Sequence, residues 1–346
     1  MTMPWPTVCL YRFSSLQNLS CRNGKTLELH LVGKIRQQLS ADPTLRPEYP
    51  SSFGLMEFSR QATEVTLGRS SRAKMENRVI SAVHTVYTMT YYSLAGIFQA
   101  AGIQDIHQYY YWDNLHRGVC LEKLLEDLEQ APERSVVVLS ASAHYPTGAD
   151  LSQKQLFPFL LLPAQALCYG DLERDAWPVQ YCVSQGMELL CAQSFSHCFG
   201  LYGEAVGHLL CVLKQNSELL SVQSQAVKIV RSLWAQPSAG GAHVVATVLS
   251  NSAHLVEWSI VERCRLIRAI LREKLRLLGT PGCWDHLTEQ GGLFCCMGLN
   301  GQQVEFLSNR RHVYLLPSGC LNISAINSRN LDYVAESIYL AVTTSP

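Results

Sequence analysis

The stretch CAQSFSHCFGLYGE at residues 191–204 decides how this 346-residue chain is interpreted. It begins inside an apolar run, MELLCAQ at 187–193, which predicts a short strand that is buried on both faces. Small and polar residues follow the run directly, so we expect the chain to turn after the strand. Ser194, Ser196 and His197 therefore lie at the end of a strand and in the turn that follows it.

Strands and helices alternate on both sides of this segment. Apolar runs predict further strands at 135–142, 156–162 and 208–213. Helical periodicity predicts helices over 172–183, 219–236 and 252–278. Short apolar runs of this kind belong to parallel or mixed sheets that helices cover. The order of elements therefore predicts an α/β fold.

The last 70 residues form a second, smaller pattern. After a turn at 279–282 we expect strands at 293–298, 313–316 and 321–325 and helices at 302–310 and 328–343. The preceding helix carries a row of basic residues: Arg263, Arg265, Arg268, Arg272, Lys274 and Arg276. Because Glu257, Glu262 and Glu273 are interleaved with them, we expect a solvated helix face rather than an anion-binding surface.

Composition narrows the function classes. The formal net charge is zero, and no basic stripe predicts a nucleic-acid partner. The first residues lack a secretion leader and the apolar run 157–168 is too short to span a bilayer, so we expect a cytoplasmic protein without membrane contact. The thirteen cysteines include no C-x-x-C pair and are expected to be thiols. A metal site of Cys191, His197 and Cys198 would lack a fourth ligand, and no metal is expected.

Seven segments follow the order of a known family: EYPSSFGLMEF (48–58), YYYWDNLHRG (109–118), GDLERDAW (170–177), SFSHCFGLYGEAVG (194–207), LGTPGCWDHLTEQGG (278–292), GLNGQQVEFL (298–307) and YLLPSG (314–319). With them the chain resembles the class I aspartate aminotransferases, which are fold type I enzymes of pyridoxal phosphate (PLP). Within the family it is similar to the cytoplasmic enzyme and to its divergent second cytoplasmic paralogue.

The resemblance implies a mixed, mostly parallel sheet with helices on both faces, and a smaller α/β domain. The large domain would span 27–262, and residues 1–26 and 263–346 would form the small one. The implied reaction converts L-aspartate and 2-oxoglutarate into oxaloacetate and L-glutamate in a PLP-containing homodimer.

Three positions that carry the family's chemistry have changed. At the position of the lysine that holds PLP as an imine, this chain has His197, and a histidine ring cannot form that imine. The Asp beside the pyridine nitrogen is Leu161, and an apolar neighbour cannot keep that nitrogen protonated. The Arg that binds the substrate carboxylate is Cys320, which has no guanidinium fork. These losses predict impaired or absent catalysis.

Other cofactor-binding positions have changed as well. The family's phosphate-binding Arg is replaced by Ala205, the Asn that contacts the ring hydroxyl by Tyr145, and the Tyr of the strand-end segment F-F-D-S-A-Y by Ala164. Ser194 and Ser196 remain, either as contacts of the cofactor phosphate or as local backbone contacts in the turn. The helix after HTV at 84–86 and the helix normally found between the P-T-G turn and the next strand are missing, since GADLSQKQ alone makes the second connection. A shortened transcript form and a decayed gene product both fit these deletions.

Two family positions survive, and both reach across the dimer in the family. Tyr49 would touch the cofactor phosphate of the partner subunit and Arg231 would bind the substrate's side-chain carboxylate there. Three hypotheses follow: an inactive member of the family, a non-catalytic partner of an active paralogue that lends Tyr49 and Arg231 in a heterodimer, and a residual enzyme in which His197 is a weak base.

Overall fold

The computed structural model describes residues 29–344, except for 46–47, 86–90, 114–117, 133–134, 142–156, 164, 168, 205, 258–260, 293 and 317–318. The chain divides into two compact units. Residues 27–87 and 133–261 form the first unit, here called the sheet unit. Residues 1–26, 88–132 and 262–346 belong to the second, here called the C-terminal unit. The expected domain limits stay a prediction, and this division differs from them over 88–132.

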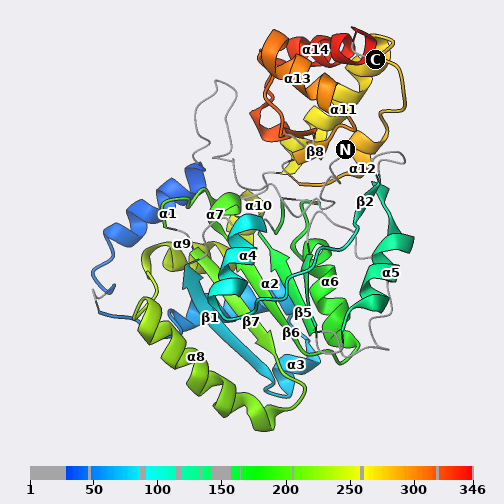
Figure 1. Ribbon diagram of the computed structural model, residues 1–346. Coiled ribbons are helices and arrows are strands. Elements are labelled where there is room, and N and C mark those ends of the chain that lie inside the picture. The colour runs from blue at the N-terminus through cyan, green and yellow to red at the C-terminus, as the bar shows by residue number, and fades with distance from the viewer. Residues whose placement is uncertain are drawn as a thin grey trace. The chain divides into compact units, whose positions relative to one another are not determined.

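A five-stranded mixed sheet, in the order β1-β7-β6-β5-β4, forms the centre of the sheet unit (Figure 1). Its strands are β1 (Val79–Thr85), β4 (Val136–Ser140), β5 (Phe157–Leu162), β6 (Leu189–Ser194) and β7 (Val206–Val212). β4, β5 and β6 pair in parallel, whereas β7 is antiparallel to both β6 and β1. Four strands therefore run in one direction and β7 runs against them.

The described helices of the sheet unit are α1 (His30–Ser40), α2 (Met56–Leu67), α3 (Arg72–Met75), α6 (Leu172–Ser184), α7 (Ser196–Phe199), α8 (Leu219–Leu233), α9 (Gly240–Leu249) and α10 (Ser252–Glu257), with a 3-10 turn η3 (Asn216–Glu218). Local sequence explains where α6 begins, because the Asp171 side chain accepts the backbone N–H groups of Glu173 and Arg174.

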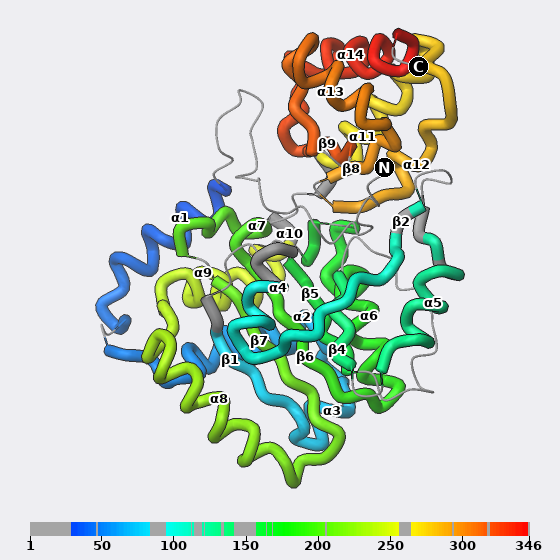
Figure 2. The backbone as a smooth tube through the Cα atoms, viewed as in Figure 1, coloured from blue at the N-terminus to red at the C-terminus, as the bar shows by residue number. Residues whose placement is uncertain are grey.

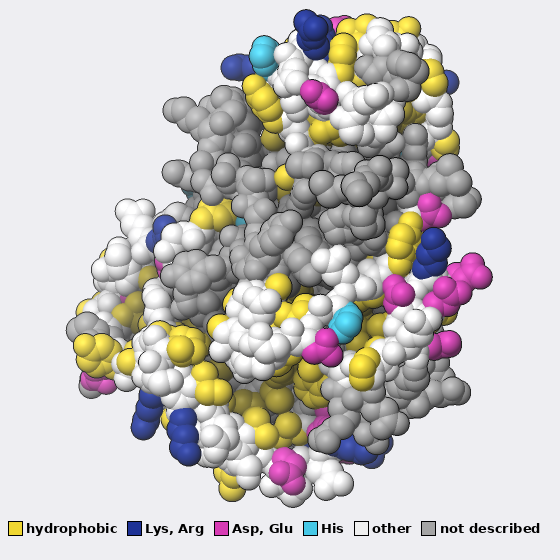
Figure 3. All heavy atoms as spheres, viewed as in Figure 1, with side chains coloured by type: hydrophobic (Ala, Val, Ile, Leu, Met, Phe, Trp, Pro, Cys, Tyr) yellow, Lys and Arg dark blue, Asp and Glu magenta, His cyan; other side chains and the backbone are white. Residues whose placement is uncertain are grey.

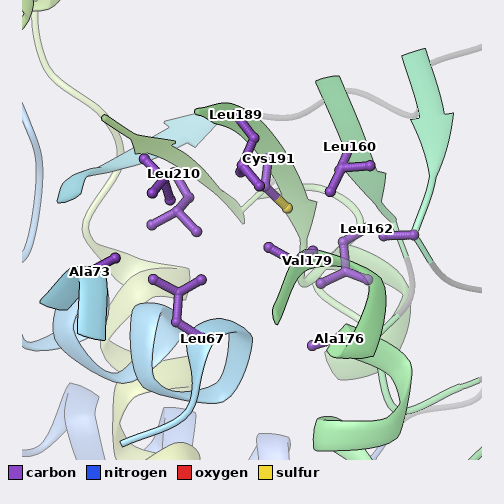
Figure 4. Close-up of a cluster of buried hydrophobic side chains, with 11 residues drawn as sticks. Leu67, Ala73, Leu160, Leu162, Ala176, Val179, Leu189, Cys191 and Leu210 are labelled. Carbon is purple, nitrogen blue, oxygen red and sulfur yellow. The ribbon is translucent and has the colours of Figure 1, made fainter. Parts of the chain in front are cut away.

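The core of this unit lies between the sheet and helices α2, α3 and α6. Leu160, Leu162, Leu189 and Leu210 extend from three neighbouring strands toward Val179 on α6 and the rest of the cluster (Figure 4). All five side chains are at most 2% exposed. Because each buried leucine contributes roughly 1.5–3 kcal/mol, this cluster supplies a large part of the free energy that holds the strands in register.

The C-terminal unit contains α4 (Tyr91–Ala100), β2 (Trp112–Asp113), β3 (Gly118–Val119), α5 (Leu121–Gln130), α11 (Val261–Leu277), α12 (His286–Glu289), β8 (Phe294–Cys296), α13 (Gly301–Arg311), β9 (Cys320–Asn322), η4 (Ile323–Ala325) and α14 (Leu331–Thr344); α11 begins one residue before the unit's limit. Strands β8 and β9 are antiparallel neighbours (Figure 2). A capping box of Asn300 and Gln303 determines the start of α13.

Three predictions from the sequence are wrong in this unit. Residues 313–316 are irregular rather than a strand, and β9 ends at Asn322, where η4 follows. Arg268 does not lie on a solvated face: its side chain is 2% exposed. Its guanidinium donates hydrogen bonds to the carbonyls of Leu287, Gly291, Gly292 and Phe294, so the backbone of these four residues surrounds it.

Several predicted features lie partly or wholly outside the described residues. The single helix expected over 252–278 is observed as α10 and α11, and residues 258–260 between them are not described. The two connections from which helices were expected to be missing include the undescribed segments 86–90 and 142–156. Tyr145, Ala164 and Ala205 also fall there.

Candidate functional site

The predicted site segment lies where β6 meets α7. β6 ends at Ser194, and α7 starts two residues later as a single helical turn. Gly200 ends that turn in the left-handed region at φ 65°, which a glycine adopts at little cost. The N–H of Leu201 donates to the Ser196 carbonyl over 2.9 Å and closes the turn. Residues 194–199 are all buried, so the turn is part of the core.

His197 is the central residue of this turn. Its side chain is 2% exposed, and its ring meets the ring of Tyr202 edge to face, with centroids 5.6 Å apart. Burial lowers the pKa of His197 below its ordinary value, since desolvation disfavours the imidazolium. The ring is therefore neutral at pH 7, and a lower pKa also makes it a weaker proton acceptor.

The two serines expected to contact a cofactor are engaged differently. Ser194 Oγ accepts the N–H of Ser196 over 3.3 Å, a local turn contact. Ser196 Oγ is buried and has no hydrogen-bond partner among the described residues. Ser194 therefore stabilises the turn, and the expected contact of either serine with a cofactor stays a prediction.

Leu161 lies beside the same strand. It precedes the last residue of β5 and is the register partner of Ala192 on β6. The structure therefore brings Leu161 to the end of β5, next to β6, and His197 follows β6 in α7. The side chain at this strand end is a leucine and carries no charge, and its match to the family's carboxylate position stays a prediction.

A buried polar network, which the sequence analysis missed, lies across β1, β6 and β7. His208 on β7 is 0% exposed, and its Nε2 lies 2.7 Å from Ser81 Oγ while its Nδ1 lies 3.0 Å from Gln193 Oε1. Thr66 Oγ1 also donates to Gln193 Oε1, over 3.1 Å. The available signal was a histidine in the middle of an apolar strand.

Backbone carbonyls determine the orientation of this network. Gln165 Nε2 donates to the carbonyls of Val65 and Leu172, so its Oε1 is left to accept from Gln193 Nε2. Gln193 Oε1 must then face His208, whose Nδ1 carries the proton. His208 is therefore a neutral Nδ1–H tautomer, and burial lowers its pKa to about 3.

Cys320 is described within the C-terminal unit, where it is the first residue of β9 and 8% exposed. Gly319 before it has φ 74°, and a Cβ there would lie 3.0 Å from the Leu299 carbonyl oxygen. This close approach requires glycine at position 319. The turn that leads to Cys320 is thus fixed in place, although its side chain carries no cation.

The two surviving family positions are both at the surface of the sheet unit. Tyr49 is 88% exposed, and Arg231, at the end of α8, donates from Nε to Ser52 Oγ over 3.2 Å. This hydrogen bond ties α8 to the segment that carries Tyr49. The roles expected for Tyr49 and Arg231 across a dimer stay a prediction.

Metal and membrane features are absent from the residues that the structure covers. No group of three His, Cys, Asp or Glu side chains could hold a metal ion there. Cys191, one of the conceivable ligands, is buried, and burial raises the pKa of its thiol to about 12. Among the described helices none is both long and apolar enough to cross a bilayer.

Fold and segment order define an aminotransferase, and comparison of the sequence supports that class directly. The sequence model of the family "Aminotransferase class I and II" matches residues 83–338. The chain belongs to the class I and II aminotransferases.

Within that class the similarity is to aspartate aminotransferases. The chain is 39% identical over 365 residues to the cytoplasmic aspartate aminotransferase of Gallus gallus. The aligned region covers 92% of this chain and 89% of that protein. It is 37% identical over 351 residues to the Homo sapiens protein named "Putative aspartate aminotransferase, cytoplasmic 2", covering 90% and 83%.

A solved structure confirms the fold. The aromatic-amino-acid aminotransferase of Burkholderia pseudomallei, covalently bound to pyridoxal phosphate, superimposes with a TM-score of 0.86 at 25% identity. The superposition covers 94% of this chain and 91% of that one. The predicted PLP-dependent transferase fold of type I is therefore correct.

The described residues do not fit PLP as the family holds it. His197 offers a buried neutral ring instead of a primary amine, and Leu161 offers no carboxylate for a pyridinium. At the turn, Ser196 Oγ is a buried hydroxyl without a hydrogen-bond partner among the described residues. One unengaged hydroxyl cannot replace an imine and a charge pair, so no chemical step through PLP follows from these residues.

Proposed function

We propose that this chain is an aspartate-aminotransferase-like protein that does not catalyse amino transfer by itself. The single observation that carries the proposal is His197, a buried neutral imidazole at the position of the family's PLP lysine. Leu161 and Cys320 add the loss of the pyridinium partner and of the substrate-carboxylate clamp. Because such groups act as a unit, their combined loss removes the reaction rather than slowing it slightly.

Covalent trapping tests this proposal. The purified chain is mixed with PLP and reduced with borohydride, and modified lysines are mapped by mass spectrometry. We expect no specific adduct on a folded protein. One lysine modified to about one equivalent in a folded dimer would reveal a replacement anchor and contradict the proposal.

A second candidate function is that of a non-catalytic subunit. We infer a cytoplasmic dimer: this chain forms a homodimer, or it forms a heterodimer in which Tyr49 and Arg231 complete the site of an active aminotransferase partner. The supporting observation is the surface of α8, where Leu220, Ile229 and Leu233 are 76%, 55% and 67% exposed. Figure 3 displays hydrophobic side chains over this part of the sheet unit. Exposed apolar side chains on the helix that carries Arg231 are typical of an interface that another subunit covers.

A tagged heterodimer with a catalytically competent class I aminotransferase tests this second function. Both tags are used in purification so that homodimers are removed. The Arg231→Ala variant should raise the KM of the partner subunit for dicarboxylate substrates. Lys228→Ala, an exposed cation on the same helix, is the matched control and should leave that KM unchanged. Equal kinetics for both variants would remove this function.

A further inference from the structure

Two cysteines of the C-terminal unit lie opposite each other in the β8–β9 pair. Cys296, the last residue of β8, is the register partner of Cys320, the first residue of β9. Directly opposite residues of antiparallel strands place their side chains on the same face of the sheet. Both carry thiols, with Cys320 buried and Cys296 half-buried.

The backbone hydrogen bonds identify the kind of pair that these cysteines form. Met297 N–H donates to the Gly319 carbonyl over 3.1 Å, so the neighbouring pair 297/319 is the hydrogen-bonded one. Hydrogen-bonded and non-hydrogen-bonded pairs alternate in antiparallel strands. The Cys296–Cys320 pair is therefore of the non-hydrogen-bonded kind, in which side chains approach more closely.

The side chain of Gln290 and the turn before β9 occupy the backbone groups of both cysteines. Gln290 Oε1 accepts the N–H of Cys296 over 2.8 Å, and Gln290 Nε2 donates to its carbonyl over 3.1 Å. The Cys320 carbonyl accepts from Leu316 N–H over 3.0 Å. These hydrogen bonds hold the backbone of each cysteine in position, and none of them involves a cysteine sulfur atom.

This geometry suits a disulfide. Non-hydrogen-bonded pairs have Cα atoms about 4.5 Å apart, and disulfides bridge Cα separations of roughly 4.4–6.8 Å. The close approach of Gly319 to the Leu299 carbonyl keeps β9 in this register. We propose that Cys296 and Cys320 form a redox-active dithiol that low-molecular-weight disulfides such as glutathione disulfide oxidise to an intramolecular disulfide.

The order of steps follows from exposure. The half-buried Cys296 thiolate attacks a sulfur of glutathione disulfide, which releases one glutathione thiolate and leaves a mixed disulfide on Cys296. The thiolate of Cys320 then attacks Cys296 Sγ and releases the second glutathione. Two protein thiols lose two protons and two electrons, and one glutathione disulfide becomes two glutathione thiols.

The neighbouring Cys295 is a poor competitor for this reaction. Alternation along β8 places its side chain on the opposite face from Cys296, and it is 0% exposed. Burial raises the pKa of Cys295 to about 11, even with the Arg268 guanidinium beside it. Little of its thiol is ionised at pH 7, and the thiolate is the reactive form.

Peptide mapping tests the proposal on the full chain. Reduced protein is incubated with glutathione disulfide, blocked with N-ethylmaleimide and digested with trypsin without reductant. We expect the peptide 277–310 to be linked to the peptide 312–329, whose cysteine is Cys320. The link should also raise the unfolding temperature by about 5 °C or more, because it closes a loop that contains α13. Dithiothreitol should reverse both changes.

Variants identify the cysteine on the longer peptide. Cys296→Ser should abolish the link, whereas Cys295→Ser and the matched surface control Cys283→Ser should retain it. Cys320→Ser should retain glutathione on Cys296, because the resolving thiol is missing. A link that persists in Cys296→Ser, glutathione adducts without any link, or Cys320→Ser without an adduct on Cys296 would each overturn the proposal.

Discussion

Nε2 of His208 lies 2.7 Å from Oγ of Ser81, so a histidine that is 0% exposed connects β7 to β1, the first strand in the order of the sheet. Thr63 Oγ1 donates to the same serine hydroxyl over 3.0 Å, which brings α2 into the network. A buried imidazole in such a network is stable while it is neutral and costly when it is charged.

Acid should therefore destabilise the protein through His208. Its pKa is about 3 in the folded state and about 6.5 when unfolded. Above pH 6.5 neither state binds the proton; between pH 6.5 and 3 the unfolded state binds it and the folded state does not. The free energy of unfolding should fall by about 1.4 kcal/mol per pH unit in that window. Urea denaturation at pH 7.5 and at pH 5 measures the loss.

The control for this pH dependence is His208→Asn, which keeps a polar group and removes the titration. His197 and His243, whose pKa values burial also lowers, act in the same direction and remain in the variant. Its stability should decline less steeply with acid than that of the parent protein. Identical slopes would assign the acid sensitivity to other groups.

Arg268 should be among the most sensitive positions of the C-terminal unit. Arg268→Lys keeps the charge but cannot donate to four backbone carbonyls at once. Each buried carbonyl left without a donor costs about 1–3 kcal/mol, so we expect a loss of about 3 kcal/mol or more in unfolding free energy. Arg276→Lys on the same helix, where Arg276 pairs with Glu273 in solvent, should change it by less than about 0.5 kcal/mol. Similar losses for both variants would contradict a special role of Arg268.

Gly54 and Gly68 provide a matched pair for measuring steric constraint near Tyr49. Both have φ 81°, but an added Cβ at Gly54 would overlap Val83, whereas nothing lies within 4 Å of one at Gly68. Gly68→Ala should cost about 1–3 kcal/mol for backbone strain alone, because φ 81° with ψ 156° is a region that glycine alone adopts readily. Gly54→Ala should cost about 1–3 kcal/mol more, because β1 must shift to relieve the overlap. Thermal unfolding of the two variants gives the difference, and equal losses would mean that the overlap relaxes freely.

Restoring the missing amine should separate attachment from catalysis. In His197→Lys we expect borohydride to trap PLP at position 197, because a buried lysine has a lowered pKa and reacts readily with carbonyl groups. Amino transfer should still be absent, since Leu161 and Cys320 are unchanged. Mass spectrometry and a coupled transaminase assay give the two readouts, with His197→Gln as the control. Lack of labelling at 197 would show that PLP does not reach this turn.

Much of the sheet was predictable because its strands are short apolar runs. The runs at 156–162 and 187–193 agree with β5 and β6 to within about two residues. Arg268 was misjudged because periodicity tells which side of a helix a residue is on, not what folds over that side. The irregular segment at 313–316 was misjudged because an apolar run does not reveal whether a neighbouring strand pairs with it.

The sequence by itself determined the family and which side chains stand at the positions expected to carry its chemistry. Seven ordered segments identify an aminotransferase, and no fold can make a primary amine from His197, a carboxylate from Leu161 or a guanidinium from Cys320. Tertiary structure alone decided which polar groups meet. His208 with Gln193, Arg268 with the segment 287–294, and Cys296 with Cys320 are brought together by strand register and by chain folding across many residues. Burial and pairing depend on those long-range contacts, which local sequence patterns do not contain.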